Sequence, residues 1–457
     1  MEDQVAAKAH TMLLGFQASN VRSFRDNIDF SLEATAMAEP GVVREIPWRE
    51  SGRNYMKVLP VAGIFGANAS GKSNLLRAME DMRTIVRESF SPHSRRQSLR
   101  YLRNPFKLSA QMTDAPSTYE IDLIINGVRH EYGFTIDNDQ VRSEWARRYP
   151  RGRAVTIFER NGPDLRLESR TAKARAMKEL LRPDALFLSV SDAAGFEDLR
   201  PLYRWFDGNL RLCDAATRDS RAQYTAHLME HEERRLQVLE ILKLADLGIT
   251  DARRRQPTKH EVELARKLFQ ALRVVNEGSS AAEEPEFALD AFSRIELSHR
   301  TTRGESIKLD SSEESLGTMV WLGLVGPLLD ALISGTVMLV DELEASLHPL
   351  LVEQFVTLFQ SPESNPNGAQ LIFNSHEAKL LGNSPSDRII GRDQAWFTEK
   401  RDDGASELYS LTDLNPRKEE AIARRYMQGR YGATPIISGN QFRALAAILT
   451  ARETVEA

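Results

Sequence analysis

A glycine-rich segment at residues 66–73 constrains this chain more than any other feature of its sequence. It has the sequence Gly-Ala-Asn-Ala-Ser-Gly-Lys-Ser and fits G-x-x-x-x-G-K-[ST], the pattern of a phosphate-binding loop. The apolar residues 58–65 ahead of it predict a buried strand, and residues 74–83 behind it carry apolar side chains at helical spacing. A strand, this loop and a helix in that order predict a site for a nucleoside triphosphate.

The residue types in the loop follow from the chemistry of phosphate binding. Glycine at positions 66 and 71 lets the backbone wrap closely, so that successive N–H groups and a helix N-terminus point at the phosphates. We expect Lys72 to reach the β- and γ-phosphates and the Ser73 hydroxyl to ligate Mg²⁺. The nucleotide-binding residues predicted from the loop are Gly66, Asn68, Ser70, Gly71, Lys72, Ser73 and Asn74.

The length and composition of the chain bound its fold class and its environment. Its 457 residues exceed one ordinary core and indicate two or three lobes, and its 41% hydrophobic and 27% charged residues are those of a soluble globular protein. The single cysteine, Cys213, excludes a disulfide framework and a cysteine-built zinc site, which fits a reducing cytosol. We interpret Cys213 as a packed apolar residue and expect a cytoplasmic protein.

One stretch, residues 319–340, is long and apolar enough for a membrane span, with Asp330 as its only charge. We instead predict a buried helix that ends near residue 333, a Ser-Gly break and a strand that runs into Asp341. A membrane segment would leave the acidic residues that follow it without a role. Residues 1–10 lack the basic-then-apolar order of a signal peptide. We therefore expect no membrane partner.

The formal net charge of −5 gives the chain no overall basic field that would attract nucleic acid. Three arginine clusters, within residues 95–103, 147–153 and 253–255, could each meet phosphates. Such clusters more often form solvated faces. Nucleic acid therefore stays open as a partner.

The remaining patterns divide the chain into three predicted parts. Residues 1–193 combine the phosphate loop with a β meander, whose clearest hairpin turns at Asn126-Gly127. Residues 194–290 are predicted to be a helical insertion that ends in a flexible acidic linker at 278–285, and residues 291–457 form a second lobe. Residues 13–24 are expected to be a strand that runs into a turn. The other strands expected from alternation and turn residues are 28–32, 119–125, 128–136, 155–158, 164–167, 185–189 and 292–299.

Two chemical features follow the insertion in a fixed order. Ser315 and Gly317 open a long apolar helix, and a small polar residue with a glycine at a helix N-terminus forms an anion site suited to a second nucleotide's γ-phosphate. The apolar strand at 337–340 then ends on Asp341 and Glu342, as a Walker B strand does. We expect Asp341 to hold the Mg²⁺ shell and Glu342 to polarise the attacking water.

A turn at 344–349 leads into a further helix, and the segment 370–376 then delivers His376 at the C-terminal edge of a strand. From that edge an imidazole could hydrogen-bond the γ-phosphate and sense its loss. Alone, His376 would be interpreted as a structural histidine, but the accompanying motifs favour a functional one. The predicted catalytic residues are Glu342, His376 and Lys72, and the predicted metal ligands are Ser73 and Asp341.

Phosphate loop, signature-like helix start, Walker B strand, turn and switch histidine, in this order, resemble the head of ABC-type ATPases. The long separation of Ser73 from Asp341 resembles the SMC-like branch, in which an insertion splits the head into two lobes. This resemblance implies an α/β P-loop NTPase fold with a two-lobed ABC/SMC-like head, an antiparallel β subdomain and a helical insertion. It also implies ATP and Mg²⁺ as cofactors and an ATPase activity that is slow if its purpose is signalling.

The resemblance extends to the opening strand and to the mode of assembly. Residues 20–24 look like the start of an SMC-like head, which places Arg22 and Ser23 near the nucleotide. Heads of this kind dimerise with ATP between them. The resemblance therefore implies a homo-oligomer in which Ser315 and Gly317 act in trans on the partner's nucleotide.

A closer resemblance is to the AAA-fifteen/AAA-twenty-one group of prokaryotic defence ATPases, which includes OLD-like, AbiL/RloA-like and PARIS-type subunits. Residues 314–318 and 341–349 are similar to the signature and Walker B segments of that group, and 426–435 resembles the RloA/AbiL tail. The chain departs from the wider pattern at the coupling loop, where Gln111 is a weak candidate for the usual glutamine and Asn104-Pro105-Phe106 occupies the region.

OLD proteins carry a Toprim nuclease on the same chain, and that chemistry needs a glutamate and a later Asp-x-Asp set to hold two metal ions. The 81 residues after His376 contain no Asp-x-Asp. The resemblance then places the effector, a Toprim-like or RloB-like nuclease, on a separate partner protein. The chain itself is expected to be the sensor and restraint of an anti-phage, abortive-infection system.

Other functions stay open. A RecF-like or SMC-like DNA-binding repair ATPase predicts a coherent basic groove built from the arginine clusters and turnover stimulated by DNA. A transporter ATPase is disfavoured by the split head and by the signature. An inactive scaffold is disfavoured because Lys72, Asp341, Glu342 and His376 occur together.

Overall fold

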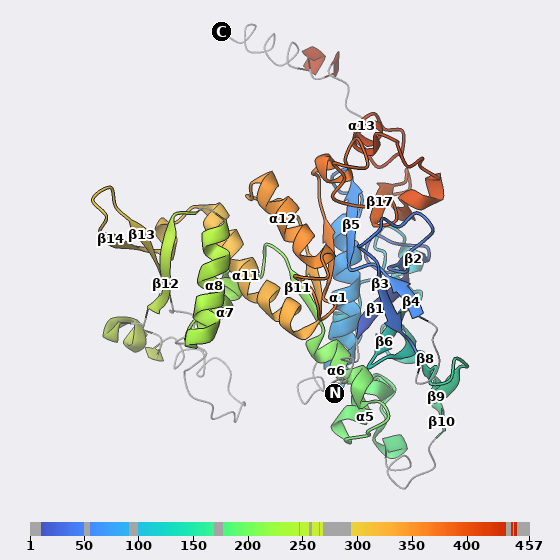
Figure 1. Cartoon of the computed structure of the whole chain (residues 1–457). Coiled ribbons are helices and arrows are strands. Elements are labelled where there is room, and N and C mark those ends of the chain that lie inside the picture. Colours follow the sequence, from blue (N-terminus) through green and yellow to red (C-terminus); the bar gives the residue numbers. More distant parts are fainter. Residues whose placement is uncertain are drawn as a thin grey trace, which may run out of the picture.

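The computed structural model of the chain describes residues 11–49, 55–90, 99–168, 177–245, 247–255, 258–264, 266–267, 294–435, 440–441 and 443–445. The predictions for residues 1–10, Arg95, Arg96 and the linker at 278–285 lie outside these residues. Figure 1 shows a main body that holds two sheets and an arm of helices that projects from it.

A seven-stranded antiparallel sheet forms one layer of the main body, in the order β10-β9-β8-β7-β6-β1-β2. The predicted hairpin between β6 and β7 is confirmed, and Asn126 and Gly127 in its turn both have positive φ, as a type I′ turn requires. Its strands are β1 (Met12–Ser19), β2 (Ile28–Ser31), β6 (Ser117–Ile125), β7 (Val128–Ile136), β8 (Val141–Arg148), β9 (Val155–Asn161) and β10 (Asp164–Leu167).

A six-stranded sheet carries the glycine-rich loop, in the order β11-β15-β16-β5-β17-β18. Neighbouring strands are parallel except at the β17–β18 edge. Every residue of β5 and of β15 is buried, which is typical of parallel strands covered on both faces. Its strands are β5 (Val61–Gly66), β11 (Leu210–Cys213), β15 (Val337–Val340), β16 (Gln370–Asn374), β17 (Ala395–Lys400) and β18 (Ser406–Ser410).

Two small sheets complete the strands: β3 (Arg44–Pro47) pairs with β4 (Tyr55–Val58), and a three-stranded sheet lies at the end of the arm. The strands of that arm sheet are β12 (Ile249–Arg255), β13 (Arg294–Arg300) and β14 (Ser306–Asp310). The helices are α1 (Lys72–Glu88), α2 (Leu99–Leu102), α3 (Ala110–Asp114), α5 (Phe187–Ala193), α6 (Arg200–Gly208), α7 (Arg218–Leu228), α8 (Glu232–Leu244), α11 (Leu316–Ser334), α12 (Pro349–Gln360) and α13 (Ile422–Met427), with short 3₁₀ turns at Ser311–Glu313, Ala378–Leu381 and Leu411–Leu414.

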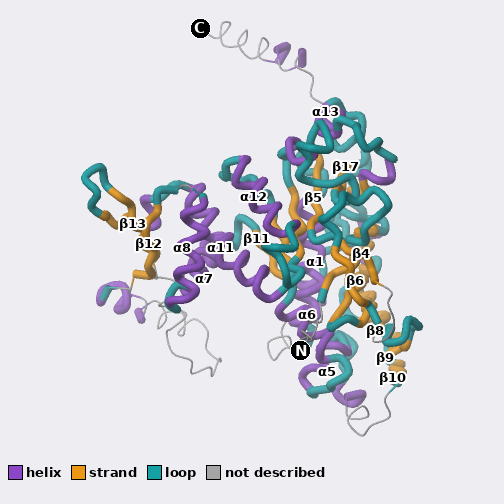
Figure 2. Tube along the Cα trace, viewed as in Figure 1, coloured by secondary structure: helices purple, strands orange, loops and turns teal. Residues whose placement is uncertain are grey.

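Hydrophobic cores lie on both faces of the parallel sheet. On β15, Val337 and Leu339 face the core that α1 and the antiparallel sheet share, whereas Met338 and Val340 face the core that contains α12. Alternate residues of one strand therefore cover opposite faces, as the pleat dictates. Figure 2 shows the resulting layers, with α1 close to the strands of both sheets.

The arm consists of α7, α8 and α11 together with the β12–β14 sheet (Figure 1). In the described part of the chain, α11 is the one helix that is long and apolar enough to cross a membrane, and 61% of its apolar window is buried. It packs closely on α7, since a Cβ added to Gly326 would lie 2.6 Å from Thr225 Oγ1. The helix ends at Gly335 in the left-handed conformation, so the predicted helix, break and strand are confirmed, and α11 is a core helix.

The predicted strand at 185–189 is wrong, because this segment begins the helix α5. The Glu144 carboxylate of β8 accepts hydrogen bonds from the backbone N–H groups of Phe187, at 2.6 Å, and Leu188, at 3.0 Å. An acidic group at a helix N-terminus satisfies free donors and complements the helix dipole. A short apolar run does not distinguish strand from helix, and the deciding contact comes from 43 residues away.

The segment from 197 to 272, predicted to be dominated by helices, also contains the strands β11 and β12. β11 has only four residues, and it is fixed by parallel pairing with β15, 127 residues further along the chain. Its Cys213 is buried, as expected of a packed apolar residue, and burial raises the pKa of the thiol to about 11. A strand of four residues is too short to be recognised from its own sequence without knowledge of the strand it pairs with.

Candidate functional site

The loop between β5 and α1 requires glycine at both positions that the pattern specifies. A Cβ on Gly66 would lie 2.5 Å from the Thr398 carbonyl oxygen. Gly71 has a φ of +116°, and a Cβ there would lie 2.5 Å from Ser406 Oγ. Both β17 and β18 therefore press against the loop and leave no room for a side chain.

Five of the seven predicted loop residues, Asn68 and residues 71–74, line one cavity of about 670 Å³ together with Glu342 and His376. Gly66, Ser70 and Asp341 do not line it. Glu342 and His376 reach it from the ends of β15 and β16, and Arg22 and Ser23 reach it from the turn after β1. The lining residues are Arg22, Ser23, Asn68, Ala69, Gly71, Lys72, Ser73, Asn74, Asn104, Pro105, Phe106, Lys107, Leu108, Glu342, His376, Lys400 and Gly404.

Lys72 lies at the base of this cavity and is held by the loop itself. Its Nζ donates to the carbonyl oxygens of Gly66, at 2.9 Å, and Ala67, at 3.0 Å. Burial lowers the pKa of Lys72, while the nearby carboxylates of Glu344, Glu342 and Asp341 act in the opposite direction. A partly buried ammonium group facing an open cavity is well placed to bind an anion.

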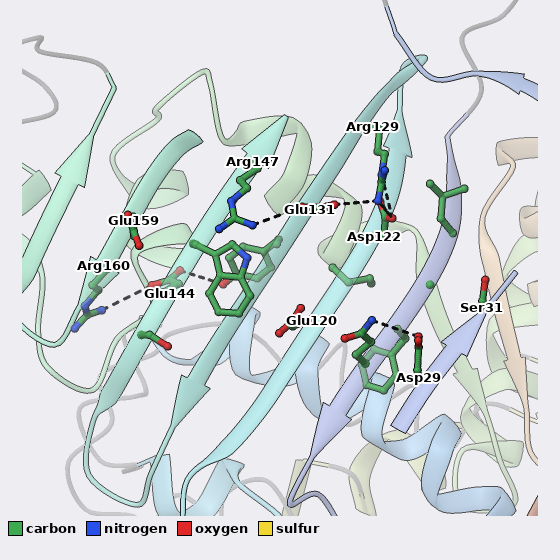
Figure 3. Close-up of a pocket in the computed structure, with 18 of the residues that line it drawn as sticks. Asp29, Ser31, Glu120, Asp122, Arg129, Glu131, Glu144, Arg147, Glu159 and Arg160 are labelled. Carbon is green, nitrogen blue, oxygen red and sulfur yellow. Dashed lines mark hydrogen bonds and ion pairs between the residues drawn. The ribbon is translucent and has the colours of Figure 1, made fainter. Parts of the chain in front are cut away.

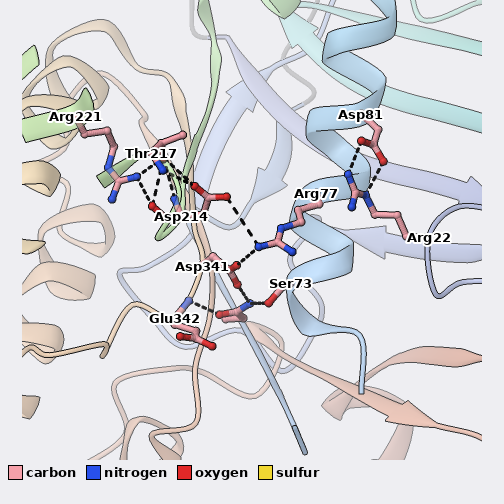
Figure 4. A network of polar contacts seen from close by, with 10 residues as sticks. Arg22, Ser73, Arg77, Asp81, Asp214, Thr217, Arg221, Asp341 and Glu342 are labelled. Atoms are coloured by element: carbon pink, nitrogen blue, oxygen red, sulfur yellow. Dashed lines mark hydrogen bonds and ion pairs between the residues drawn. The ribbon is translucent and has the colours of Figure 1, made fainter. Parts of the chain in front are cut away.

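A polar network joins the ends of β15 and β16 to the first turn of α1 (Figure 4). Asn374 is fully buried, and its amide oxygen accepts the backbone N–H of Glu342 at 2.5 Å. Its Nδ2 donates to Asp341 Oδ1 at 2.5 Å and to Ser73 Oγ at 3.3 Å. Glu342 has a φ of +55°, a conformation that non-glycine residues rarely adopt outside constrained sites. Asn374 therefore fixes the two predicted metal ligands and the backbone of Glu342 together.

This arrangement fits Mg²⁺. Among the described residues, no group of three or more His, Cys, Asp or Glu side chains is placed to hold a metal ion. Mg²⁺ suits such a site, because it usually binds one or two protein ligands and takes the rest from phosphates and water. Ser73 and Asp341, which share a hydrogen-bond donor, would supply the two protein ligands.

The other oxygen of Asp341 faces a cation from α1. Arg77 Nη2 lies 3.3 Å from Asp341 Oδ2 and 3.9 Å from the carboxylate of Asp214, which follows β11 (Figure 4). Arg77 comes five residues after Lys72, one helical turn into α1. It links the Walker B strand to the edge strand of the same sheet.

Glu344 approaches the site from the turn after β15. Its Oε1 accepts the backbone N–H of His376 at 2.5 Å, and its other oxygen is buried without a hydrogen-bond partner. Glu344 is also the carboxylate with the largest effect on the pKa of Lys72. It holds the backbone at His376 in place.

The turn after β1 is tied to the loop from the other side. Arg22 forms a two-point ion pair with Asp81 of α1, at 2.6 and 2.5 Å. Ser23 Oγ accepts a hydrogen bond from Asn74 Nδ2 at 2.8 Å and from Ser406 Oγ at 2.8 Å. The sequence motif near residue 22 therefore lies beside the phosphate loop.

Some predicted residues lie elsewhere. Ser315 caps α11, where its Oγ accepts the Thr318 N–H at 3.1 Å, and Gly317 packs against the Ser346 carbonyl oxygen. Neither lines the cavity of the phosphate loop. The Ser70 hydroxyl is buried and bonds to Thr398 Oγ1 at 2.7 Å. In the region of the coupling loop, residues 104–108 line the cavity, whereas Gln111 does not.

Sequence reasoning missed Asn374, Arg77 and Glu344 as members of the site. Asn374 comes two residues before His376, at the end of a strand that parallel pairing brings beside β15. A polar residue at the carboxyl end of a buried strand beside a Walker B strand is a usable signal. Arg77 gives no local signal, because its partners come from distant strands.

Comparisons with known proteins place this geometry in a family. No curated protein matches the chain. Similar solved structures include "Crystal structure of the SmcHead bound to the C-winged helix domain of ScpA", at 13% identity over 88% of this chain and 99% of that chain with a TM-score of 0.45. Another is an Smc head domain with an extended coiled coil bound to the C-terminal domain of ScpA derived from Pyrococcus furiosus, at 13% identity, 89% and 98% coverage and a TM-score of 0.40. An SMC head domain from Thermotoga maritima matches at 13% identity, 87% and 98% coverage and a TM-score of 0.36.

The predicted α/β P-loop fold class is confirmed, since a parallel core sheet carries the phosphate loop beside an antiparallel sheet. A family model described as "AAA domain, putative AbiEii toxin, Type IV TA system" matches residues 61–382, which include both the phosphate loop and His376. The chain therefore belongs to this AAA_21 family of P-loop ATPase domains.

Proposed function

We propose that the chain binds and hydrolyses ATP with Mg²⁺ and serves as the sensor and regulatory subunit of a cytoplasmic anti-phage system. The observation that carries the catalytic part is the cavity in which Lys72, Glu342 and His376 meet from three different elements. A phosphate loop with an acidic residue and an imidazole at its mouth supplies what hydrolysis of a γ-phosphate requires.

Each residue has a distinct part in this proposal. Lys72 exchanges the loop carbonyls for phosphate oxygens, and the backbone N–H groups after Gly66 cradle the phosphates. Ser73 and Asp341 would hold Mg²⁺, which would supply positive charge to offset that of the phosphates. Glu342 orients a water for attack and accepts its proton, and His376 donates a hydrogen bond to the γ-phosphate.

Assembly into an ATP-bound dimer would complete the site. Ser315 and Gly317 lie outside the cavity of their own chain, while the start of α11 is an N-terminal helix cap that favours an anion. A second copy would bring this cap to the γ-phosphate. The three predicted parts, 1–193, 194–290 and 291–457, stay a proposal for how the chain divides.

The role in defence is supported by the family description, which refers to a toxin of a toxin–antitoxin system. In this proposal the toxic activity belongs to a separate Toprim-like or RloB-like nuclease. A DNA-binding repair ATPase is less well supported. Arg253, Arg254 and Arg255 of one arginine cluster each pair with a carboxylate instead of presenting free charge.

The first experiment compares ATP turnover and native mass of the wild type with Glu342→Gln. The variant keeps Lys72 and both metal ligands, so we expect turnover to fall by about 100-fold or more while ATP-dependent assembly persists. Glu363→Gln, which changes an exposed glutamate after α12, is the matched control. Unchanged turnover in Glu342→Gln would remove the catalytic assignment.

A second experiment separates the defence and repair functions. Wild type and Glu342→Gln are each purified with and without the protein encoded next to them, and turnover is measured with and without duplex DNA. A stable complex with the neighbour in the ATP-bound variant supports the sensor role. Stimulation by DNA without any bound neighbour supports the repair function instead.

A further inference from the structure

The antiparallel sheet presents a hollowed acidic face on the side away from α1, with a cavity of about 650 Å³ (Figure 3). The hollow has a local cause. Gly15 pairs with Asp122 and Gly133 pairs with Trp145 on this face, and neither glycine contributes a side chain to it. The Trp145 side chain of β8 fills the space over Gly133, so closely that a Cβ there would lie 2.3 Å from the indole. The floor of the cavity is therefore a half-buried aromatic ring.

Carboxylates outnumber guanidinium groups around this hollow. Seven acidic side chains line it against three arginines, and one pair, Glu144 with Arg160, is buried beneath the surface. Arg129 is already engaged by Asp122, at 2.6 Å, and by Glu131, at 2.9 Å. The face as a whole therefore carries excess negative charge.

Three of these carboxylates, those of Glu33, Glu120 and Glu159, are uncompensated, and two of them flank Trp145. Among the described residues, Glu120 and Glu159 have no hydrogen-bond or ion-pair partner, and no dashed line reaches either of them in Figure 3. Glu120 faces Glu131 and Asp29 as well as Arg147, and its partial burial leaves it poorly solvated, which raises its pKa. By register, Trp145 lies between Gly133 and Glu159, and Gly133 lies beside Glu120. An indole face flanked by two free carboxylates is a receptor for a guanidinium or ammonium group.

A metal ion held by protein side chains alone does not fit this face, since the described residues contain no arrangement of three or more acidic, His or Cys side chains able to hold one. The phosphates that usually complete a Mg²⁺ site are repelled by the carboxylates of this face. Nucleic acid is excluded from this face by the repulsion between its phosphates and the carboxylates. The occupant is then a cationic side chain presented by a polypeptide, because the hollow runs across several strands and offers further carboxylates, such as Asp29 and Glu33, along its length.

We propose that the outer face of the seven-stranded sheet is a docking surface for an arginine- or lysine-rich segment of another protein, with one cationic side chain seated on Trp145 between Glu120 and Glu159. The surface is separate from the nucleotide cavity, with which it shares no lining residue. A partner docked there would leave the ATP site open, so the two sites can be tested independently.

The test uses the full-length chain and a fluorescent twelve-residue peptide of alternating arginine and serine, followed by fluorescence anisotropy at low and physiological salt. We expect saturable binding that the double variant Glu120→Gln/Glu159→Gln weakens by about ten-fold or more, as loss of two charge-assisted contacts predicts. Trp145→Ala should weaken binding as well. The charge-matched control is Glu233→Gln/Glu240→Gln on α8, which should bind like the wild type.

Retained ATP binding in every variant confirms that each is folded. Equal binding by the wild type, both double variants and Trp145→Ala would overturn the proposal, because it would show attraction to net charge alone. A doubled native mass of the free chain that the Glu120/Glu159 variant abolishes would also overturn it, since a second copy would then cover this face.

Discussion

The guanidinium group of Arg77 lies 3.3 Å from the carboxylate of Asp341, on the oxygen opposite to the one bonded by Asn374. A cation from the chain is thus bound to the carboxylate that is proposed to hold Mg²⁺. The two cations compete for the charge of Asp341, although Asp214 offers Arg77 a second partner at 3.9 Å.

Replacing Arg77 with alanine should therefore strengthen Mg²⁺ binding. We expect the Mg²⁺ concentration that half-saturates ATP turnover to fall by about three- to ten-fold, because Asp341 loses its internal counter-ion. Arg87→Ala is the control, since Arg87 lies on the same helix as Arg77 and forms a surface pair with Asp207 of α6. A Mg²⁺ requirement that is unchanged or higher in Arg77→Ala would contradict this competition.

Asn374 offers a second prediction, because one buried amide holds three parts of the site. In Asn374→Ala the Glu342 N–H loses its acceptor, which costs about 1–3 kcal/mol of stability. Turnover should fall by about 10- to 100-fold while ATP binding persists, as for other residues that orient metal ligands. The matched control is Asn365→Ala, in which a buried asparagine with backbone partners only is lost. If Asn365→Ala and Asn374→Ala reduce turnover equally, the role of Asn374 is only structural.

Asp393, just before β17, predicts a pH dependence of stability. Burial raises its pKa to about 6 from an ordinary 3.8, and its Oδ1 is buried without a partner. The folded state therefore binds the proton more tightly than the unfolded state, so this group's contribution to stability declines as pH rises from about 4 to 6. Asp393→Asn mimics the protonated form and should gain about 1–3 kcal/mol at pH 7.5 but little at pH 4.

Urea unfolding of the wild type and Asp393→Asn at both pH values measures this gain. The control is Asp387→Asn, because backbone hydrogen bonding lowers the pKa of Asp387 and its contribution should have the opposite pH trend. A gain in Asp393→Asn that is the same at pH 4 and pH 7.5 would rule out titration of Asp393 as its cause.

Glu144 joins the antiparallel sheet to α5, which gives a fourth prediction. It is fully buried and accepts hydrogen bonds from Phe187, Leu188 and Tyr132, with Arg160 at 3.8 Å. In Glu144→Ala the arginine is left buried without its counter-charge, and stability should fall by about 3–5 kcal/mol. Hydrogen exchange at residues 187–190 should rise first, because α5 loses its N-terminal acceptor.

Glu159→Ala on the neighbouring strand provides the comparison for Glu144→Ala, since its side chain is exposed. That variant should be almost as stable as the wild type. Equal losses of stability in the two variants would show that the buried carboxylate does not anchor the helix.

The sequence allowed us to predict that Lys72, Glu342 and His376 share one cavity, because their motifs are local and follow one another in a fixed order. Lys72, Glu342 and His376 each stand at the end of a recognisable strand or the start of a helix, and parallel pairing brings these ends together. Asn374 was within reach of the same reasoning. Ser70, by contrast, has a side chain whose partner Thr398 lies 328 residues away, and no local pattern reports that contact.

The wrong prediction of a strand at 185–189 and the failure to predict β11 have the same physical origin. The residues of α5 are apolar enough for a strand, and the carboxylate of Glu144 makes them a helix. β11 is too short to show a period of its own, and its pairing with β15 closes over a long loop. Both depend on tertiary contacts, which outweigh local preference when a segment is only a few residues long.

The arm is attached to the main body through two neighbouring strands of the parallel sheet. The chain enters the arm directly after β11 and leaves it through α11 into β15, and these two strands are parallel neighbours. The 19 residues of α11 span about 28 Å, and the helix contains Pro327, which removes one backbone hydrogen bond from its interior. Both connections between the arm and the main body therefore end at the carboxylates that Arg77 bridges, those of Asp214 and Asp341.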